Sequence, residues 1–243
     1  MGDQLTGAPA NPDPRSRGKE TLLPREFFGR PSLEVAPALL GCVLECDSVA
    51  GLVAVRVTEV EAYSGATDPA SHAYRRKSGR NQVMFGPPGF AYVYQIYGLH
   101  FCVNLVCQPA GTAEAVLLRA GQVVAGTEVA WSRRPAARTE DHLARGPALL
   151  CQVLAIDRRF DGTDVCVADS PVRILGPRPG DAPAAGVIRA GPRVGVTQAA
   201  GYPWRFWIDG DRTVSAYRKA VPRKRPGTQT VTTPGREGGS IQP

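Results

Sequence analysis

The chain has 243 residues, of which 43% are hydrophobic, so it is long enough for one large domain with a sizeable core. No apolar stretch reaches the roughly 18 residues that a membrane-spanning helix needs, and we expect a soluble, intracellular protein. The net charge of +7 favours a polyanionic partner, although residues 218–243 hold +5 of it (six basic residues against one acidic) and leave +2 for residues 1–217.

Two terminal stretches differ from the rest of the chain in composition. Residues 1–20 are rich in Pro, Asp, Arg and Gly without an apolar period, and residues 218–243 have the same character with added basic charge. We predict that both are disordered tails, and the first lacks the apolar core of a secretory signal. Residues 21–217 show no internal repeat or linker, which predicts a single domain between the tails.

In chain order, the apolar and turn-forming residues predict a sheet with a few helices. A short helix is expected within 31–41, ended by Gly41, and a second within 146–156, where Pro147 suits the first helical position. The predicted strands span 43–44, 52–63, 115–119, 165–175, 193–197 and 204–208. Residues 64–89 are polar and irregular. Strands joined by turns, without regular βαβ alternation, predict an α+β fold with a mostly antiparallel sheet.

The stretch VTEVEAYSG, residues 57–65, carries two glutamates at the end of an apolar run. The strand period of two puts Glu59, Glu61 and Tyr63 on the face begun by Val57 and the valines before it. An acidic end to a core face indicates either a strand that runs out into water or the floor of a polar site. Periodicity alone does not decide between a strand end in water and the floor of a site. It also does not show which of the two carboxylates has a chemical role.

Residues 90–108 are rich in aromatic and β-branched residues and are broken at Gly98, which is the signature of a β-hairpin. Tyr92 and Tyr94 share one face of the first strand. If the turn centres on Gly98, Tyr92 lies opposite Asn104, and Tyr94 and Asn104 share a surface. By composition alone, Tyr92 is expected to be an ordinary half-buried strand residue.

Tyr97 is harder to explain as a core residue. It lies beside Gly98 at the expected tip of the hairpin, where an aromatic side chain has little core to join. An aromatic side chain on a projecting tip suits a wedge that fills the gap left when a base leaves the DNA stack.

The six cysteines form no C-x-x-C pair and no Cys/His cluster with zinc spacing. Most have apolar neighbours, as Cys42 does between Gly41 and Val43. We therefore expect reduced cysteines that serve as small core residues, with neither a metal nor another cofactor.

Seven stretches that cover nearly all of 25–208 in order resemble the alkyladenine (3-methyladenine) DNA glycosylase family, the monofunctional enzymes that excise alkylated purines. They are EFFGRPSLEVAPALLGCVL (26–44), VTEVEAYSG (57–65), DPASHAY (68–74), RNQVMFGPPGFAYVYQIYGLHFCVN (80–104), AVLLRA (115–120), RGPALLCQVLAID (145–157) and PRVGVT (192–197). The resemblance implies a single catalytic domain on a curved antiparallel sheet with surrounding helices and a protruding hairpin. It also implies double-stranded DNA with damaged purines as the partner. We expect a monomeric, cytoplasmic bacterial protein associated with the nucleoid.

The resemblance implies a role for each matched residue. Glu61 matches the general base that activates water, and Arg119 matches a residue that holds the water and the carboxylate. Residues that match the pocket around the flipped base are Tyr63, His72 and Tyr94, which sandwich it, Asn104, which excludes guanine by crowding its 2-amino group, and Leu117 nearby. Tyr97 matches the residue that enters the minor groove. The loop that contacts phosphate contains Arg76, Lys77, Ser78 and Arg80.

The implied chemistry fits these residue types. Alkylation at N3 or N7 makes the purine cationic and a good leaving group, and a carboxylate can orient water against the developing oxocarbenium ion. Tyrosine faces favour a cationic ring by about 1–2 kcal/mol. Because the matched motifs hold no lysine placed as a Schiff-base nucleophile, we predict simple hydrolysis to an abasic site without lyase activity. Glu61 is the predicted base on a pocket floor, and Glu59 is expected to have a supporting or structural role.

Two other functions are compatible with the residues alone. A sugar hydrolase would use Glu59 and Glu61 as an acid/base pair, since alternate residues of one strand face place their Cβ atoms roughly 6.5–7 Å apart. A non-catalytic DNA-binding module would use the basic tail and the hairpin for affinity, and would not depend on Glu61.

Overall fold

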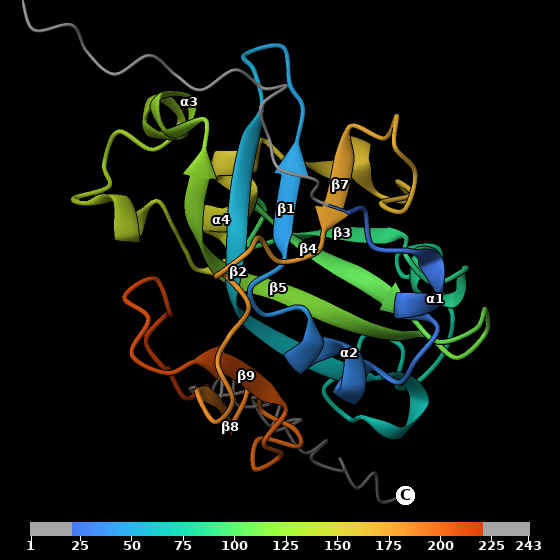
Figure 1. Ribbon diagram of the computed structural model, residues 1–243. Coiled ribbons are helices and arrows are strands. Elements are labelled where there is room, and N and C mark those ends of the chain that lie inside the picture. The colour runs from blue at the N-terminus through green and yellow to red at the C-terminus, as the bar shows by residue number, and fades with distance from the viewer. Residues whose placement is uncertain (1–20, 221–243) are drawn as a thin grey trace, which may run out of the picture.

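The computed structural model describes residues 21–220, so the predicted tail 1–20 and all but the first three residues of the predicted tail 218–243 lie outside the described residues. Within the described range, nine strands form one sheet in which every pairing is antiparallel, with short helices around it (Figure 1). This confirms the predicted α+β fold class.

The sheet is organised around two long strands. Its main path runs β3 (Ala91–Ile96), β4 (His100–Cys107), β5 (Glu114–Ala125), β2 (Val53–Ser64), β1 (Val43–Cys46) and β7 (Val172–Leu175). Off this path, β6 (Ala144–Arg145) pairs with β5, and β9 (Arg205–Ile208) pairs with both β2 and β8 (Ile188–Gly191). On the edge of β2 away from β5, β1 borders its first half and β9 its second. The second half of β2 therefore lies between β5 and β9.

Between residues 21 and 220, four α-helices pack around the sheet: α1 (Arg25–Phe28), α2 (Ser32–Ala38), α3 (Thr127–Arg133) and α4 (Pro147–Leu154). As predicted, α4 begins with Pro147, and it packs on β4 and β5 through Leu150 and Leu154. Short 3-10 helices lie at Gly65–Thr67, Gln82–Phe85, Glu140–His142 and Arg158–Phe160. The main core joins α2 and α4 to the apolar faces of the long strands, which bend along their length (Figure 1).

The hairpin follows the predicted register, with Tyr92 opposite Asn104 and Tyr94 opposite Cys102. The helix predicted within 31–41 is confirmed as α2. All six cysteines are free, five are buried, and burial raises the pKa of Cys42 to about 12. Within residues 21–220, no helix has both the length and the apolar character needed to cross a bilayer.

Three element predictions are wrong in extent or place. The strand predicted at 193–197 is a loop, because Pro192 supplies no backbone N–H and Gly195 adopts a φ of +72°, and the strand lies instead at β8. Only the end of 165–175 is a strand. The strand predicted at 115–119 continues to Ala125, past Gly121, where an added Cβ would meet the Arg56 carbonyl oxygen at 2.4 Å. The helices α1 and α3 were not predicted.

The predicted common face of Val57, Glu59 and Glu61 is also wrong. The pairing of β2 with β5 shifts register between Val57 and Val60, which is the mark of a β-bulge. Before the bulge Val57 belongs to the main core, and after it Val60 and Ala62 do. The bulge therefore turns Glu59 and Glu61 onto the face opposite the core valines.

Candidate active site

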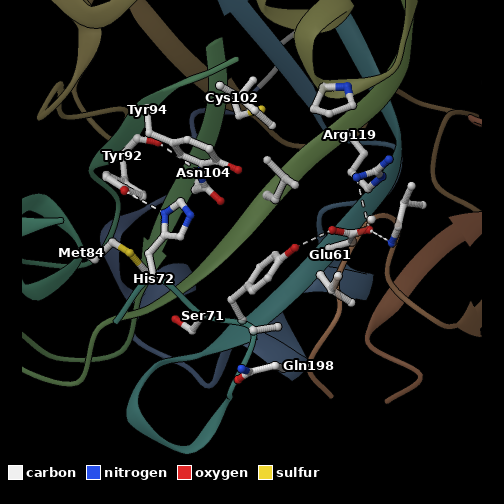
Figure 2. Close-up of a pocket in the computed structure, with 18 of the residues that line it drawn as sticks. Glu61, Ser71, His72, Met84, Tyr92, Tyr94, Cys102, Asn104, Arg119 and Gln198 are labelled. Carbon is white, nitrogen blue, oxygen red and sulfur yellow. Dashed lines mark hydrogen bonds and ion pairs between the residues drawn. The ribbon is translucent and has the colours of Figure 1, made fainter. Parts of the chain in front are cut away.

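A pocket of about 420 Å³ opens between the second half of β2, the β3–β4 hairpin, β5 and the loop after β8. The seven residues predicted for catalysis or base binding all line it: Glu61, Tyr63, His72, Tyr94, Asn104, Leu117 and Arg119. In Figure 2, His72, Tyr92 and Tyr94 gather at one side, and Glu61 and Arg119 lie at the other. The pocket thus combines an aromatic wall with a charged wall.

Glu61 is fully buried and held in one orientation by three donors. The Tyr63 hydroxyl donates to Oε2 at 2.7 Å, and the backbone N–H of Val194 donates to Oε1 at 2.7 Å. The Arg119 guanidinium lies 3.2 Å from Oε1. Val194 is a site residue that the sequence did not single out, although it lies in the matched stretch PRVGVT. A buried carboxylate with fixed oxygens is suited to orienting a water molecule.

The groups around Glu61 keep their protons. Burial, followed by the charge of Glu61, raises the pKa of Tyr63 well above its ordinary value, so Tyr63 remains a hydroxyl donor. Burial alone would lower the pKa of Arg119, but the carboxylates of Glu61 and Glu59 outweigh it and leave the pKa raised. Arg119 therefore stays cationic beside the two carboxylates.

Glu59 is separated from the pocket by its own set of donors. Its Oε1 accepts from Arg119 Nε at 2.9 Å, Arg205 Nε at 2.7 Å and Ser215 Oγ at 2.9 Å, and its Oε2 accepts from the Ser215 N–H at 2.7 Å. Burial would raise the pKa of Glu59, but the two guanidiniums and Ser215 outweigh it and lower the pKa. Glu59 does not line the pocket and is a buried anion between two arginines.

A second buried ion pair, formed by an arginine and an aspartate, supports the Tyr63 ring. Arg193 lies with its guanidinium 4.6 Å from the Tyr63 ring centroid and forms a two-point ion pair with Asp68. It also donates to the Ala62 carbonyl at 2.9 Å. Because Arg193 does not line the pocket, it supports the Tyr63 ring from outside the cavity.

The aromatic wall also contains Tyr92, for which composition predicted only an ordinary half-buried position on a strand. Tyr92 is almost fully buried, lines the pocket, and its hydroxyl lies 3.0 Å from His72 Nδ1. The His72 ring meets the Tyr94 ring edge-on with centroids 4.6 Å apart, and Tyr92 stacks on Tyr94 at 5.5 Å. His72 is exposed to solvent as a residue, yet partial burial of its ring against the pocket wall and then the charge of Arg80 lower its pKa. At neutral pH the wall is therefore uncharged.

Asn104 and Leu117 lie on neighbouring strands and face each other across the β4–β5 pairing. Asn104 Nδ2 donates to the Tyr92 carbonyl at 3.1 Å, which fixes the plane of the amide in the pocket wall. Asn104 thus satisfies a backbone group, as expected for an ordinary strand asparagine, and also lines the cavity. The amide cannot turn away from the cavity without losing this hydrogen bond.

Tyr97 projects from the tip of the hairpin and is 80% exposed, as is Leu99 beside it. Tyr97 and Gly98 both have positive φ angles, +52° and +73°, the pattern of a type I′ turn. The Gln95 side chain donates to the Gly98 carbonyl at 2.7 Å and closes the turn. A tyrosine held in this unfavourable backbone region, and left in solvent, indicates a function rather than a packing role.

The residues predicted to contact phosphate form an exposed loop next to the pocket: Arg76, Lys77, Ser78 and Arg80. Asn81, which the sequence did not single out, organises this loop from within. Its Oδ1 accepts from the Ser78 N–H and hydroxyl at 2.6 and 3.0 Å. Its Nδ2 donates to the carbonyls of His72 and Arg76 at 2.9 and 3.1 Å. The basic loop is therefore tied directly to the pocket wall.

Within the part of the chain that the structure describes, no group of three or more His, Cys, Asp or Glu side chains is placed to hold a metal ion. A buried carboxylate with fixed oxygens, facing a cavity walled by aromatic rings, suits a class of enzyme that binds a flat ring and activates water beside it.

Comparison with known proteins makes this class specific. The family model described as methylpurine-DNA glycosylase (MPG) matches residues 26–212. A Streptomyces avermitilis protein named "Putative 3-methyladenine DNA glycosylase" is 54% identical over 84% of this chain and 96% of its own length. Proteins of the same name from Frankia casuarinae and Nocardia farcinica are 49% and 48% identical over 83% and 82% of this chain, and 94% and 92% of theirs. The chain belongs to the methylpurine-DNA glycosylase family. It is a DNA glycosylase of DNA repair, and its substrate is DNA.

Proposed function

We propose that the protein hydrolyses the N-glycosidic bond of alkylated purines such as 3-methyladenine, and of deaminated purines such as hypoxanthine, flipped out of duplex DNA, and leaves an abasic site. The observation that carries this proposal is the orientation of Glu61 by Tyr63, Val194 and Arg119 opposite an aromatic wall in one pocket. The names of the relatives support the choice of 3-methyladenine.

In the proposed reaction, Glu61 is the general base. Three donors occupy its oxygens, and a carboxylate has about four acceptor sites, which leaves one for the attacking water. Arg119 holds the carboxylate and the water together. As the glycosidic bond breaks, the negative charge of Glu61 stabilises the developing oxocarbenium ion, and the water adds to the sugar.

The aromatic wall is proposed to bind the flipped base. Neutral Tyr63, Tyr94 and His72 offer electron-rich faces to a cationic, alkylated ring, an attraction of about 1–2 kcal/mol when desolvated. Because alkylation already makes the purine a good leaving group, binding and water activation suffice, and no lysine nucleophile or lyase step is involved.

Flipping is proposed to use the exposed features around the pocket. Tyr97 would enter the minor groove and restore the stacking lost when the base leaves, which offsets part of a cost of a few kcal/mol. The basic loop, with Arg76, Lys77, Ser78 and Arg80, would hold phosphates beside the pocket. We propose that the enzyme acts as a monomer on the double-stranded DNA of the nucleoid.

The test is incubation of the purified protein with duplexes that contain one 3-methyladenine or one hypoxanthine. We expect release of the free base and an intact strand that breaks only after hot alkali treatment. Strand cleavage without alkali would contradict the absence of lyase activity. Duplex binding without base release would favour the DNA-binding module, and cleavage of sugar substrates would favour the sugar hydrolase.

Asn104→Ser should relax the exclusion of guanine. Serine lacks the amide that lies fixed between the Tyr92 carbonyl and the pocket, so the 2-amino group of guanine gains space. We expect guanine release to rise by about tenfold or more, the range for removing a small steric block. Leu117→Val, the cross-strand neighbour, also enlarges the pocket but keeps the amide, and it should not release guanine faster. Equal guanine release by wild type and Asn104→Ser would remove this role.

Acid should slow the release of cationic bases more than the release of neutral bases. The lowered pKa keeps His72 neutral at pH 7, and protonation begins only as the pH falls below its ordinary value of 6.5. A cationic His72 then repels an alkylated purine but not neutral hypoxanthine. We expect the release of 3-methyladenine, relative to hypoxanthine, to fall as the pH drops below about 6.5 in wild type. His72→Gln should show a flat ratio, and a falling ratio in that variant would exclude His72 as the cause.

Removing the basic C-terminal tail should lower the affinity for DNA without changing the rate of base release. Arg218 must be kept, because its carbonyl accepts from the N–H of Gly195 in the pocket loop at 3.1 Å. Truncation after Ala220 should weaken salt-sensitive binding to undamaged DNA and reduce its salt slope, since fewer phosphates are neutralised. Single-turnover base release should stay unchanged, and its loss would make the tail part of the site. Glutamine at Arg223, Lys224 and Arg225 should reproduce the binding change.

A further inference from the structure

Ser215, in the segment that follows β9, reaches the buried side of the active site. Its backbone N–H donates to Glu59 Oε2 at 2.7 Å, and its hydroxyl donates to Glu59 Oε1 at 2.9 Å. Its carbonyl accepts from Arg205 Nη2 at 2.8 Å, and Arg205 Nε also donates to Glu59. One residue thus holds both the carboxylate and one of its two arginines.

The contacts of Ser215 continue to the proposed general base. Glu59 Oε1 accepts from Arg119 Nε at 2.9 Å, and the Nη1 of the same guanidinium lies 3.2 Å from Glu61 Oε1. A guanidinium is planar and rigid, so the position of its Nε fixes the position of its Nη1. Because Glu59 is fully buried and does not line the pocket, no solvent is at hand to replace a donor that it loses. The position of Arg119 relative to Glu61 therefore depends on the position of Glu59.

The backbone around Ser215 is anchored independently of Glu59. Arg56 forms an ion pair with Asp211 at 2.7 Å, and the Thr213 hydroxyl bonds that of Thr58 at 2.8 Å. Arg145 Nε donates to the Val214 carbonyl at 2.8 Å. Three anchors within four residues set the position of Ser215, so Ser215 positions Glu59 and not the reverse. The family match ends at residue 212, and Ser215 lies beyond it.

We propose that Ser215 is a positioning residue for base release: through Glu59 it fixes Arg119 in the orientation that holds the Glu61 carboxylate and its water. This inference rests on the proposed function of Glu61. Ser215 does not line the pocket, so it acts on the rate of the chemical step and not on the binding of DNA.

The effect of losing the hydroxyl follows from the geometry. In Ser215→Ala, Glu59 Oε1 keeps only its two arginines, and the carboxylate is free to turn toward either of them. A shift of about 1 Å in a reacting geometry costs up to about 10²-fold in rate. We expect single-turnover release of hypoxanthine to fall about tenfold, because the N–H of Ser215 still holds Oε2. The dissociation constant for a duplex with a tetrahydrofuran abasic-site analogue should be unchanged.

Three variants test this inference. Ser215→Thr restores a hydroxyl and should recover most of the rate. Ser170→Ala lies beside β7, outside the pocket lining, and loses a buried hydroxyl bond to the Val172 carbonyl at 2.8 Å without touching Ser215 or its anchors. It should lower the melting temperature about as much as Ser215→Ala does but release base at the wild-type rate.

The outcomes separate this inference from the function it rests on. A rate in Ser215→Ala equal to that of wild type, or an equal rate loss in Ser170→Ala, overturns the positioning role, as does failure of Ser215→Thr to recover activity. No base release by wild-type protein would instead overturn the proposed function. A slower variant with weaker binding of the abasic duplex would place Ser215 in DNA binding, against the proposal.

Discussion

Glu61→Gln should reduce single-turnover base release by about 10²- to 10⁴-fold, the range for loss of a general base. The amide is nearly isosteric and can still accept from Tyr63 or Val194, but it has no negative charge to activate water or to stabilise the oxocarbenium ion. The rate should be measured with saturating enzyme on a hypoxanthine duplex, so that binding does not limit it.

Binding is the control for this variant. Because Tyr97 and the basic loop lie outside the carboxylate network, Glu61→Gln should bind an abasic-analogue duplex as tightly as wild type. Base release at an undiminished rate would remove Glu61 as the base and leave the aromatic pocket as a binding site alone.

Glu59→Gln should destabilise the protein strongly. It leaves the guanidiniums of Arg119 and Arg205 in the protein interior without their shared anion. Breaking one side of a buried ion pair costs about 3–5 kcal/mol, and the free energy of unfolding should fall by that amount. Asp209→Asn removes an exposed ion pair with Arg189 and should cost only about 0–1 kcal/mol.

The same variant has a pH signature in the stability of the protein. The folded state lowers the pKa of Glu59 below its ordinary value of 4.5. Its contribution to stability is therefore present above pH 4.5 and is lost as the pH falls through the lowered value. The difference in unfolding free energy between wild type and Glu59→Gln should be constant from pH 5 to 7 and shrink below pH 4.5. A difference that persists undiminished at pH 2 would show that the variant acts through packing and not through charge.

These expectations distinguish the glycosylase from a sugar hydrolase with two catalytic carboxylates. Glu59 has its oxygens occupied by Arg119, Arg205 and Ser215 and does not reach the pocket. A general acid needs a protonated oxygen at the leaving group, and the environment of Glu59 favours the anion. The two glutamates of one short stretch therefore differ in role: Glu61 faces the cavity, and Glu59 holds the residue that holds Glu61.

The sequence by itself determined the features whose cause is local. Alternating aromatic and β-branched residues around Gly98 predicted the hairpin and its register, because a tight turn sets which residues face each other. Pro147 placed the start of α4, and the resemblance of the motifs gave the seven predicted residues that line one pocket. The hairpin and helix patterns are short in sequence, and the motifs match as a set. Both can therefore be recognised without knowledge of the tertiary packing.

The resemblance distinguished the two glutamates, but only the tertiary structure decided which groups hold each of them. A period of two assumes an unbroken strand, but β2 bulges between Val57 and Val60 where it pairs with both β5 and β9, and the faces exchange there. Two of the residues that donate to Glu59, Arg205 and Ser215, lie about 150 residues away in the sequence. One donor to Glu61 is a backbone N–H in a loop that the sequence pattern predicted to be a strand. Such contacts are fixed by how distant segments pack against β2, which no local pattern records.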